Sequence, residues 1–271
     1  MTPILIAFGL AQAAATTPAA PATEQARFRT CAEQARTAPE AAIAAANAWR
    51  AEGGRFEARQ CLGLAYVALG RWHSAATVYE QAAREAETAD EPHRADFWVQ
   101  AGNAWLAAEE GAKAIQAFDA ALATPHLSDE LRGEAHLDRA RALVALDNPA
   151  AARVDLDRAL QLVAADPFAW YLSAGLARRQ NDMARAATDI ARARELAPND
   201  PDILLLAGTL AGLVGNGAEA ERLYRQVAAA APDSEAGRAA TAALNTMQDA
   251  APAPAPSTPA PQTAPQPPQP R

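Results

Sequence analysis

The sequence predicts an all-α fold in which a pair of helices is repeated along the chain. Half of the 271 residues are hydrophobic by a count that includes alanine, and aromatic residues make up only 6%. Alanine, leucine, glutamate, arginine and glutamine are strong helix formers. Runs of alternating β-branched residues, which would predict strands, are missing. Proline-containing dipeptides, which interrupt the helix-forming stretches, also recur at a fixed interval. Asp166-Pro167 returns as Asp200-Pro201 and Ala197-Pro198 returns as Ala231-Pro232, each 34 residues later.

The chain begins with an apolar run, from about Ile4 to Ala15, followed by small residues. A membrane span needs about 20 apolar residues, so this run is too short to cross a bilayer comfortably. Ala11-Gln12-Ala13 and Ala13-Ala14-Ala15 both suit cleavage. We therefore expect residues 1–22 to be a signal peptide and the mature protein to be periplasmic or secreted. No lysine or arginine precedes the run, which leaves a disordered leader on a cytoplasmic protein as the alternative.

The chain has two cysteines, Cys31 and Cys61. An even number of cysteines in an oxidising compartment predicts one disulfide. The alternative is that each cysteine is a small apolar residue on a helix face. Neither belongs to a Cys-x-x-Cys pair, so the sequence gives little support for redox catalysis or zinc binding.

Two blocks follow the proline punctuation, one from Pro167 and one from Pro201. Each contains two apolar stretches with helical spacing, separated by a polar or glycine-containing turn near residues 180–182 or 215–217. Proline suits the first turn of a helix but cannot continue one from inside. Each block is therefore predicted to be a helix–turn–helix unit.

The same pattern of small, alanine and aromatic residues occurs upstream, for example in "RQCLGLAYVALGRWHSAATVYEQAA". The sequence resembles the tetratricopeptide repeat family, whose first helix carries a Trp, a small pair and an aromatic residue, and whose second helix carries Ala, an aromatic residue and Pro. The matching residues are Leu62, Gly63, Tyr66, Ala75, Tyr79 and Ala82; Trp98, Ala101, Gly102, Trp105, Ala114, Phe118 and Ala121; Ala140, Leu143, Ala152, Leu156 and Ala159; Trp170, Ala174, Ala177, Ala186, Ile190, Ala193 and Pro198; and Ala207, Gly208, Ala211, Ala220, Tyr224, Ala228 and Pro232.

Five small residues of the first helices serve as reference positions, namely Gly63, Gly102, Ala140, Ala174 and Gly208. They follow one another at intervals of 39, 38, 34 and 34 residues. The two long intervals contain polar, turn-rich segments near "ETADEPH" and "TPHLSD", which are predicted to be extended loops. An alanine-rich helical bundle with coincidental spacing is the alternative to the repeat.

The resemblance implies a right-handed superhelical solenoid of about five to six helix–turn–helix units. The solenoid is expected over residues 23–249, with units near 24–54, 56–88, 95–125, 133–164, 167–198 and 201–232. The first unit is degenerate, with helices expected over 23–35 and 39–52. Since the first helices of successive units lie side by side in such a stack, a Cys31–Cys61 disulfide is geometrically reasonable.

A stack of repeats needs a polar capping element at its end, and the sequence after the last repeat predicts one. Ser234 can cap a helix near residues 234–248, and this helix carries an apolar stripe of Ala239, Ala243, Leu244 and Met247. We predict it to be the C-terminal capping helix. Residues 250–271 are rich in proline and carry a single charged residue from 251 onward, so a disordered tail is expected there.

The sequence contains no recognisable constellation for catalysis, cofactor binding or metal binding. Its four histidines, His73, His93, His126 and His136, occur without a His-Glu-x-x-His motif or a nearby cysteine. The net charge of −8 argues against a nucleic-acid-binding surface overall. We expect a protein that is not an enzyme, needs no cofactor or metal, does not bind nucleic acid, and has no stable membrane span after signal removal.

The function is then expected to lie in the surface that the stack makes. The resemblance implies that the first helices line a concave groove, and an apolar groove of that size usually marks a protein-binding site. The predicted groove residues are Leu64, Val67, Val99, Asn103, Leu106, Leu137, Arg141, Val144, Tyr171, Arg178 and Leu205. Asn103 matches the asparagine with which some family members hold a C-terminal carboxylate, but Glu134 and Asp138 occupy positions where basic residues are needed. We therefore reject a carboxylate clamp.

These observations predict a non-catalytic scaffold or adaptor that binds another protein or a peptide in its groove, in the envelope of a bacterial-type cell. A self-assembling structural protein and a regulatory accessory subunit of an enzyme are the alternatives.

Overall fold

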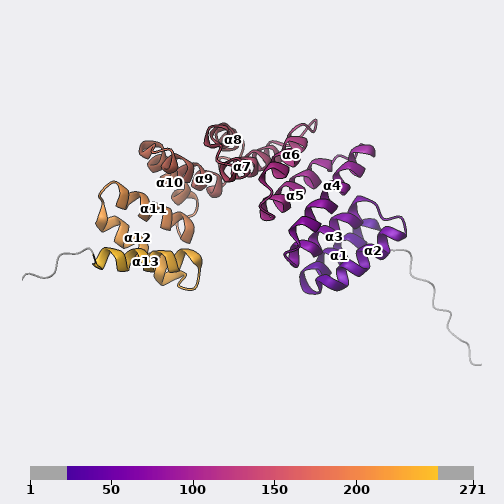
Figure 1. The fold of residues 1–271 in the computed structure, drawn as a ribbon, viewed down its shortest axis with the longest axis horizontal. Coiled ribbons are helices and arrows are strands. Elements are labelled where there is room, and N and C mark those ends of the chain that lie inside the picture. The colour runs from indigo at the N-terminus through magenta and orange to yellow at the C-terminus, as the bar shows by residue number, and fades with distance from the viewer. Residues whose placement is uncertain (1–22, 250–271) are drawn as a thin grey trace, which may run out of the picture. The chain divides into compact units, whose positions relative to one another are not determined.

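The computed structural model describes residues 23–249, and within this range it contains thirteen α-helices and no strand (Figure 1). The prediction of an all-α repeat solenoid is confirmed. The predicted signal peptide, residues 1–22, and the predicted tail, residues 250–271, lie outside the described residues. The helices are α1 Glu24–Thr37, α2 Pro39–Ala51, α3 Phe56–Ala68, α4 Trp72–Thr88, α5 Arg94–Ala107, α6 Gly111–Leu122, α7 Asp129–Ala145, α8 Pro149–Leu162, α9 Pro167–Arg179, α10 Met183–Leu196, α11 Pro201–Leu213, α12 Gly217–Ala230 and α13 Glu235–Asp249.

The chain divides after Asn148 into two compact units, called unit 1 and unit 2 here. Unit 1 contains α1–α7, and unit 2 contains α8–α13. Within each unit a helix packs against the next one in the chain, as α3 does with α4 and α11 with α12. The odd-numbered helices α1–α11, called first helices below, also contact one another inside a unit: α1 with α3, α5 with α7, and α9 with α11.

The Asp-Pro pairs that punctuate the sequence mark helix starts in unit 2. Pro167 and Pro201 are the first residues of α9 and α11. The Asp166 side chain accepts a hydrogen bond from the backbone N–H of Phe168, and Asp200 accepts from two N–H groups of the first turn of α11. Each carboxylate thus satisfies N–H groups that have no partner inside the helix.

Glycine at the helix crossings is required by the close approach of an aromatic ring. A Cβ atom added to Gly63 would lie 2.4 Å from the Tyr79 ring, and one added to Gly102 would lie 2.5 Å from the Phe118 ring. Gly208 has the same relation to Tyr224, at 2.8 Å. In all three pairs the aromatic residue follows the glycine by 16 positions, so the sequence register and the packing agree.

In the five pairs from α3/α4 to α11/α12, the turn between the two helices contains one residue in the left-handed conformation, whereas the α1–α2 turn, at Ala38 with a φ of −150°, contains none. Gly70 and Gly215 supply it with φ values of 65° and 83°. At the equivalent places in the other repeats, Glu109, Asp147 and Asn181 adopt φ values of 61°, 55° and 60°. Residues with a Cβ atom are strained in this region, and glycine is not.

The last helix, α13, packs against α12 and α11. Ser234 accepts a hydrogen bond from the backbone N–H of Gly237 at 2.9 Å, as a helix cap does. Ala243, Leu244 and Met247 pack against the unit 2 core, whereas Ala239 of the predicted stripe is exposed.

The first pair of helices is tied to the second by a disulfide between Cys31 of α1 and Cys61 of α3, whose Cα atoms are 5.9 Å apart. The structure therefore joins the two cysteines as the sequence predicted. Around the disulfide lies a small apolar cluster with Trp49 as its largest member. The main core of unit 1 is a separate cluster built from α3–α7, with rings such as Phe118 and Trp105 among alanines.

Unit 2 contains one buried polar network that the repeat pattern does not provide. Ser173 of α9 donates a hydrogen bond to Asp189 of α10. Arg153 of α8 donates to the Ser173 hydroxyl at 2.8 Å, and Arg185 contacts both Asp189 and Asp157. The equivalent pairs are apolar in three other repeats, namely Leu62 with Val78, Ala101 with Ala117, and Ala207 with Leu223. In the repeat between them the pair is charged, Arg139 with the buried Asp155.

Candidate functional site

The predicted groove residues of unit 1 begin with Leu64 and Val67 on α3. Both are half-buried, and together with Ala68 they form one wall of a hollow of about 470 Å³. The opposite wall belongs to α1 and includes Phe28, Ala32 and Ala35 among its residues. The lining is mainly apolar, and α1 and α3 pack side by side, so the hollow is a depression between two first helices.

Charged side chains stand on the α1 side of this hollow. Arg36 pairs with Glu33 one turn before it, so those two charges largely offset each other. Arg29 is exposed, and its side chain forms no ion pair or hydrogen bond with another described residue. The hollow therefore offers an apolar floor next to one unpaired positive charge. A segment with an apolar side chain and a neighbouring carboxylate would complement it.

Two predicted groove residues of unit 1 are buried. Val99 of α5 is 7% exposed and Leu137 of α7 is 5% exposed, and Val99 belongs to the unit 1 core. Both stand three residues before a reference glycine or alanine. Residues one or four positions after the reference, such as Asn103 and Val144, keep part of their surface accessible. Val99 and Leu137 therefore support the helices, and are not available to a partner.

The remaining predicted residues of unit 1 are accessible to different degrees. Asn103 and Val144 are half-buried, and Leu106 is partly buried against the unit 1 core. Arg141 is exposed and pairs with Asp138 at 2.9 Å. The surface made by the accessible residues of α1, α3, α5 and α7 is called the first-helix face of unit 1 below.

In unit 2, the predicted residues Tyr171, Arg178 and Leu205 are all half-buried. The Tyr171 ring stacks on Phe168 with centroids 5.9 Å apart. Burial raises the pKa of Tyr171, and the nearby carboxylates of Asp202 and Asp200 raise it further. Tyr171 and Leu205 pack against the unit 2 core, so only part of each is open to a ligand.

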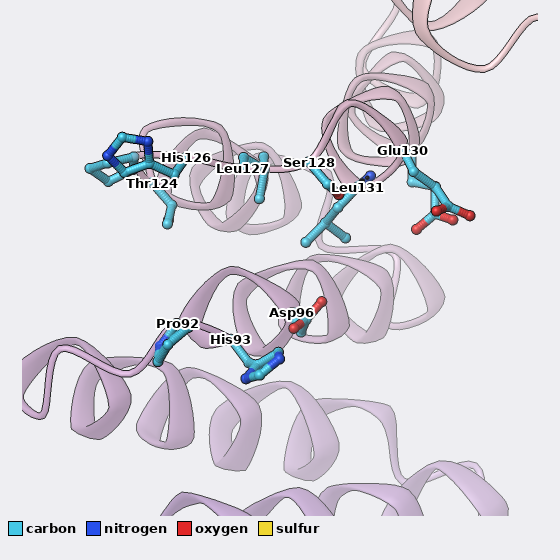
Figure 2. Close-up of a pocket in the computed structure, with 11 residues that line it drawn as sticks. Pro92, His93, Asp96, Thr124, His126, Leu127, Ser128, Glu130 and Leu131 are labelled. Carbon is cyan, nitrogen blue, oxygen red and sulfur yellow. Dashed lines mark hydrogen bonds between the residues drawn. The ribbon is translucent and has the colours of Figure 1, made fainter.

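A second depression, of about 370 Å³, lies where the two sequence insertions meet (Figure 2). Figure 2 shows His93 and Asp96 on one side and Leu127, Ser128 and Leu131 on the other. Sequence reasoning predicted both loops but did not predict that they face each other. Their position in the sequence could have indicated that the two loops lie close together, because they occupy the 39- and 38-residue intervals between three consecutive repeats.

The extra residues of the second insertion lengthen a helix. α7 begins eleven residues before its reference residue Ala140, whereas α3, α9 and α11 begin seven residues before theirs. The additional turn carries Leu131, which packs on the unit 1 core, and Glu130, which faces the depression. Burial raises the pKa of Asp96 on the facing helix, and His93 partly offsets this. The depression is acidic and polar, in contrast to the apolar hollow between α1 and α3.

The family of this chain is identified by its match to a model of a known protein family. A model of the tetratricopeptide repeat matches residues 62–127 and 137–201. The chain belongs to the tetratricopeptide repeat family. No curated protein sequence matches it.

Solved tetratricopeptide repeat structures share its fold. PilW, described as a widely conserved type IV pilus biogenesis factor, is 20% identical, with 83% of this chain and 98% of that one covered and a TM-score of 0.67. PilF of Pseudomonas aeruginosa is 17% identical, with 81% and 97% covered and a TM-score of 0.66. A tetratricopeptide repeat protein of Parabacteroides merdae is 15% identical, with 83% and 86% covered and a TM-score of 0.60. At such identities the likeness concerns the fold alone.

Tetratricopeptide repeats generally serve as non-catalytic modules for protein–protein interaction, and the fold is that of an interaction scaffold. Among residues 23–249, no group of three or more histidine, cysteine or acidic side chains is placed to hold a metal ion. In the same range, no helix is both long and apolar enough to cross a membrane.

Proposed function

We propose that this tetratricopeptide repeat protein is a non-catalytic scaffold that binds a segment of another protein on the first-helix face of unit 1, in the envelope of a bacterial-type cell. The single observation that carries the proposal is the hollow between α1 and α3. Two residues predicted from the repeat register, Leu64 and Val67, line it and remain accessible.

The chemistry of the hollow suits a peptide segment. Covering apolar side chains such as Phe28, Leu64 and Val67 removes their surface from water, at about 25 cal/mol per Å². The exposed Arg29 can pair with a carboxylate of the partner, and such charge pairs favour the correct partner and orientation more than they add affinity. A helix or an extended segment with one apolar side chain beside an acidic group fits this surface.

The envelope location rests on the amino-terminal sequence and the disulfide. The predicted signal peptide would deliver the chain to an oxidising compartment, where a Cys31–Cys61 disulfide is stable. One similar structure is that of PilW, described as a type IV pilus biogenesis factor, which is compatible with an envelope role.

Affinity capture with surface variants tests the proposal. Val67→Glu places a carboxylate in the hollow and should abolish capture of the partner, because burying an unpaired charge is strongly unfavourable. Val154→Glu is the matched control, since Val154 is 63% exposed on α8 of unit 2. Thermal unfolding of both variants shows whether each remains folded.

Arg29→Glu provides a second variant with little risk to folding, because Arg29 is exposed and its side chain has no ion-pair partner within residues 23–249. It should weaken capture with no change in melting temperature. If folded Val67→Glu and Arg29→Glu proteins both retain every partner of the unaltered protein, the site lies elsewhere on the molecule.

Self-assembly is the competing function, and the end of the repeat array argues against it. The outward residues of α13, including Arg238, Asn245, Thr246 and Gln248, are exposed and polar. A polar terminal helix prevents end-to-end stacking of repeat arrays. Size-exclusion chromatography with light scattering should therefore report a monomer at micromolar concentration, and larger species would favour self-assembly.

A further inference from the structure

The first helix pair, α1 and α2, has few polar links to the rest of unit 1. The hydrogen bonds of its side chains stay inside the pair, as between Trp49 and Glu24 at 2.8 Å and between Arg27 and Glu52 at 2.7 Å. Among the described residues, no hydrogen bond or ion pair joins α1 or α2 to α3 or α4. The charges that do meet across this contact repel, because Glu24 of α1 contributes to raising the pKa of Glu57 on α3, after the larger effect of burial.

Apolar contact between this pair and α3 includes the partly buried Phe28 and Ile43, but few large side chains that are fully buried. Its buried members are mostly alanines, namely Ala35, Ala42 and Ala46, and Trp49 is the only large buried side chain that α1 and α2 contribute. A terminal unit of a repeat array has a neighbour on one side only. The Cys31–Cys61 bond is therefore the strongest single link between the pair and α3.

The disulfide comes nearest to solvent at Cys31, which is buried with 5% of its surface exposed. Cys31 lines a crevice of about 260 Å³ between α1 and α2, together with Arg27, Gln34 and Trp49. Cys61 is fully buried on the far side of the bond. A thiolate in the crevice would approach the disulfide from its Cys31 side, beside the Arg27 guanidinium, which is paired with Glu52.

We propose that the Cys31–Cys61 disulfide is a redox latch, whose reduction releases α1 and α2 from α3 and so removes one wall of the binding hollow. The bond joins α1 to α3 one turn before Leu64, and Phe28, Ala32 and Ala35 of α1 line the hollow on either side of Cys31. The consequence for partner binding rests on the function proposed above; the release of the helices does not.

The reductant of this latch is a dithiol. Its thiolate attacks the Cys31 sulfur, forms a mixed disulfide and expels the Cys61 thiolate, which takes up a proton. The second thiol of the reductant then attacks the mixed disulfide and frees Cys31. Two electrons and two protons pass to the protein, and the reductant leaves as a disulfide.

Hydrogen exchange read by mass spectrometry tests the latch on the intact protein, oxidised or reduced with dithiothreitol. Amides of α1 and α2 should exchange faster after reduction by roughly a few hundredfold, the factor expected for losing a cross-link over a loop of 30 residues. Amides of α9–α12 serve as the internal control and should not change. Reoxidation should restore slow exchange. The Cys31→Ser/Cys61→Ser protein, which has no disulfide, should exchange as the reduced protein does, with or without dithiothreitol.

The outcomes separate the latch from the proposed function. Equal exchange of α1 and α2 in both redox states overturns the latch, whatever the protein binds. Faster exchange together with equal capture by the oxidised and reduced proteins, in the affinity experiment above, also overturns it as a control of binding. If helix release is observed but Val67→Glu does not alter capture by the oxidised protein, the latch stands as a conformational switch and the assigned binding surface is wrong.

Discussion

At the residue scale, the repeat is held by a few positions at which size or backbone conformation leaves little choice. The crossings carry glycine or alanine, and a large residue 16 positions later fills the space that remains: an aromatic ring opposite glycine, and Leu156 or Ile190 opposite alanine. Five of the six turns between paired helices contain a left-handed residue, yet Glu109, Asp147 and Asn181 occupy three of them. The first requirement could be predicted from spacing. The second could not, because the residue types at these turns differ from the glycine that the conformation favours.

The glycines therefore differ sharply in what a substitution does. Gly102→Ala should destabilise the protein by about 1–3 kcal/mol, because the new Cβ would approach the Phe118 ring. Gly175→Ala is the matched control: it lies within α9 and its Cβ would meet no atom within 4 Å. That change should stabilise the helix by about 0.5–1 kcal/mol. Urea unfolding of both variants checks the prediction, and equal effects of the same sign would contradict the assigned crossing.

At the strained turns, a substitution is expected to raise the stability of the protein, whereas Gly102→Ala is expected to lower it. Glu109→Gly should raise the free energy of unfolding by about 1 kcal/mol, since it relieves a φ of 61° at an exposed residue. Ala107→Gly, at an exposed position near the end of α5, is the control and should lower it by a similar amount. Thermal unfolding distinguishes the two. A loss of stability in Glu109→Gly would mean that the turn is not under strain.

At the scale of the elements, the positions of the prolines and the spacing of the small residues predicted the helix pairs. Both depend on local geometry, since proline suits the start of a helix and a small residue suits a close helix crossing. The surface of each helix was harder to predict. Val99 and Leu137 have the right periodicity for the first-helix face, but periodicity does not reveal which neighbours cover a position. The additional turn of α7, which adds Leu131 to the unit 1 core, depends on how an insertion folds. For the same reason the depression between the two inserted loops was not foreseen.

The polar network of unit 2 also lies at this scale. Asp189→Ala should cost about 3–5 kcal/mol, because it removes the acceptor of Ser173 and a partner of Arg185 in a buried site. The double variant Ser173→Ala/Asp189→Leu copies the apolar pair Ala207 and Leu223 of the next repeat and should recover most of that loss. Chemical denaturation of the single and double variants tests this. A double variant as unstable as the single one would show that the network cannot be replaced by apolar packing.

At the scale of the whole molecule, the chain is two compact helical units with sequence extensions at both ends. Export of the chain is a prediction that concerns the first extension. If the leader is removed, amino-terminal sequencing of the mature protein should begin near Ala14 or Thr16. Material that retains Met1 in the cell envelope, or protein found only in the cytoplasm, would contradict export.

The central claim is that a partner protein docks on the first-helix face of unit 1, and site-specific photocrosslinking in living cells tests it most directly. A photoreactive phenylalanine analogue at Leu64 lies in the hollow, and the same analogue at the exposed Val154 reports unit 2. The account predicts one dominant crosslinked protein from position 64, which is absent from position 154 and weaker when Arg29→Glu is added. A partner that crosslinks from position 154 and not from position 64, in a folded protein, would contradict it.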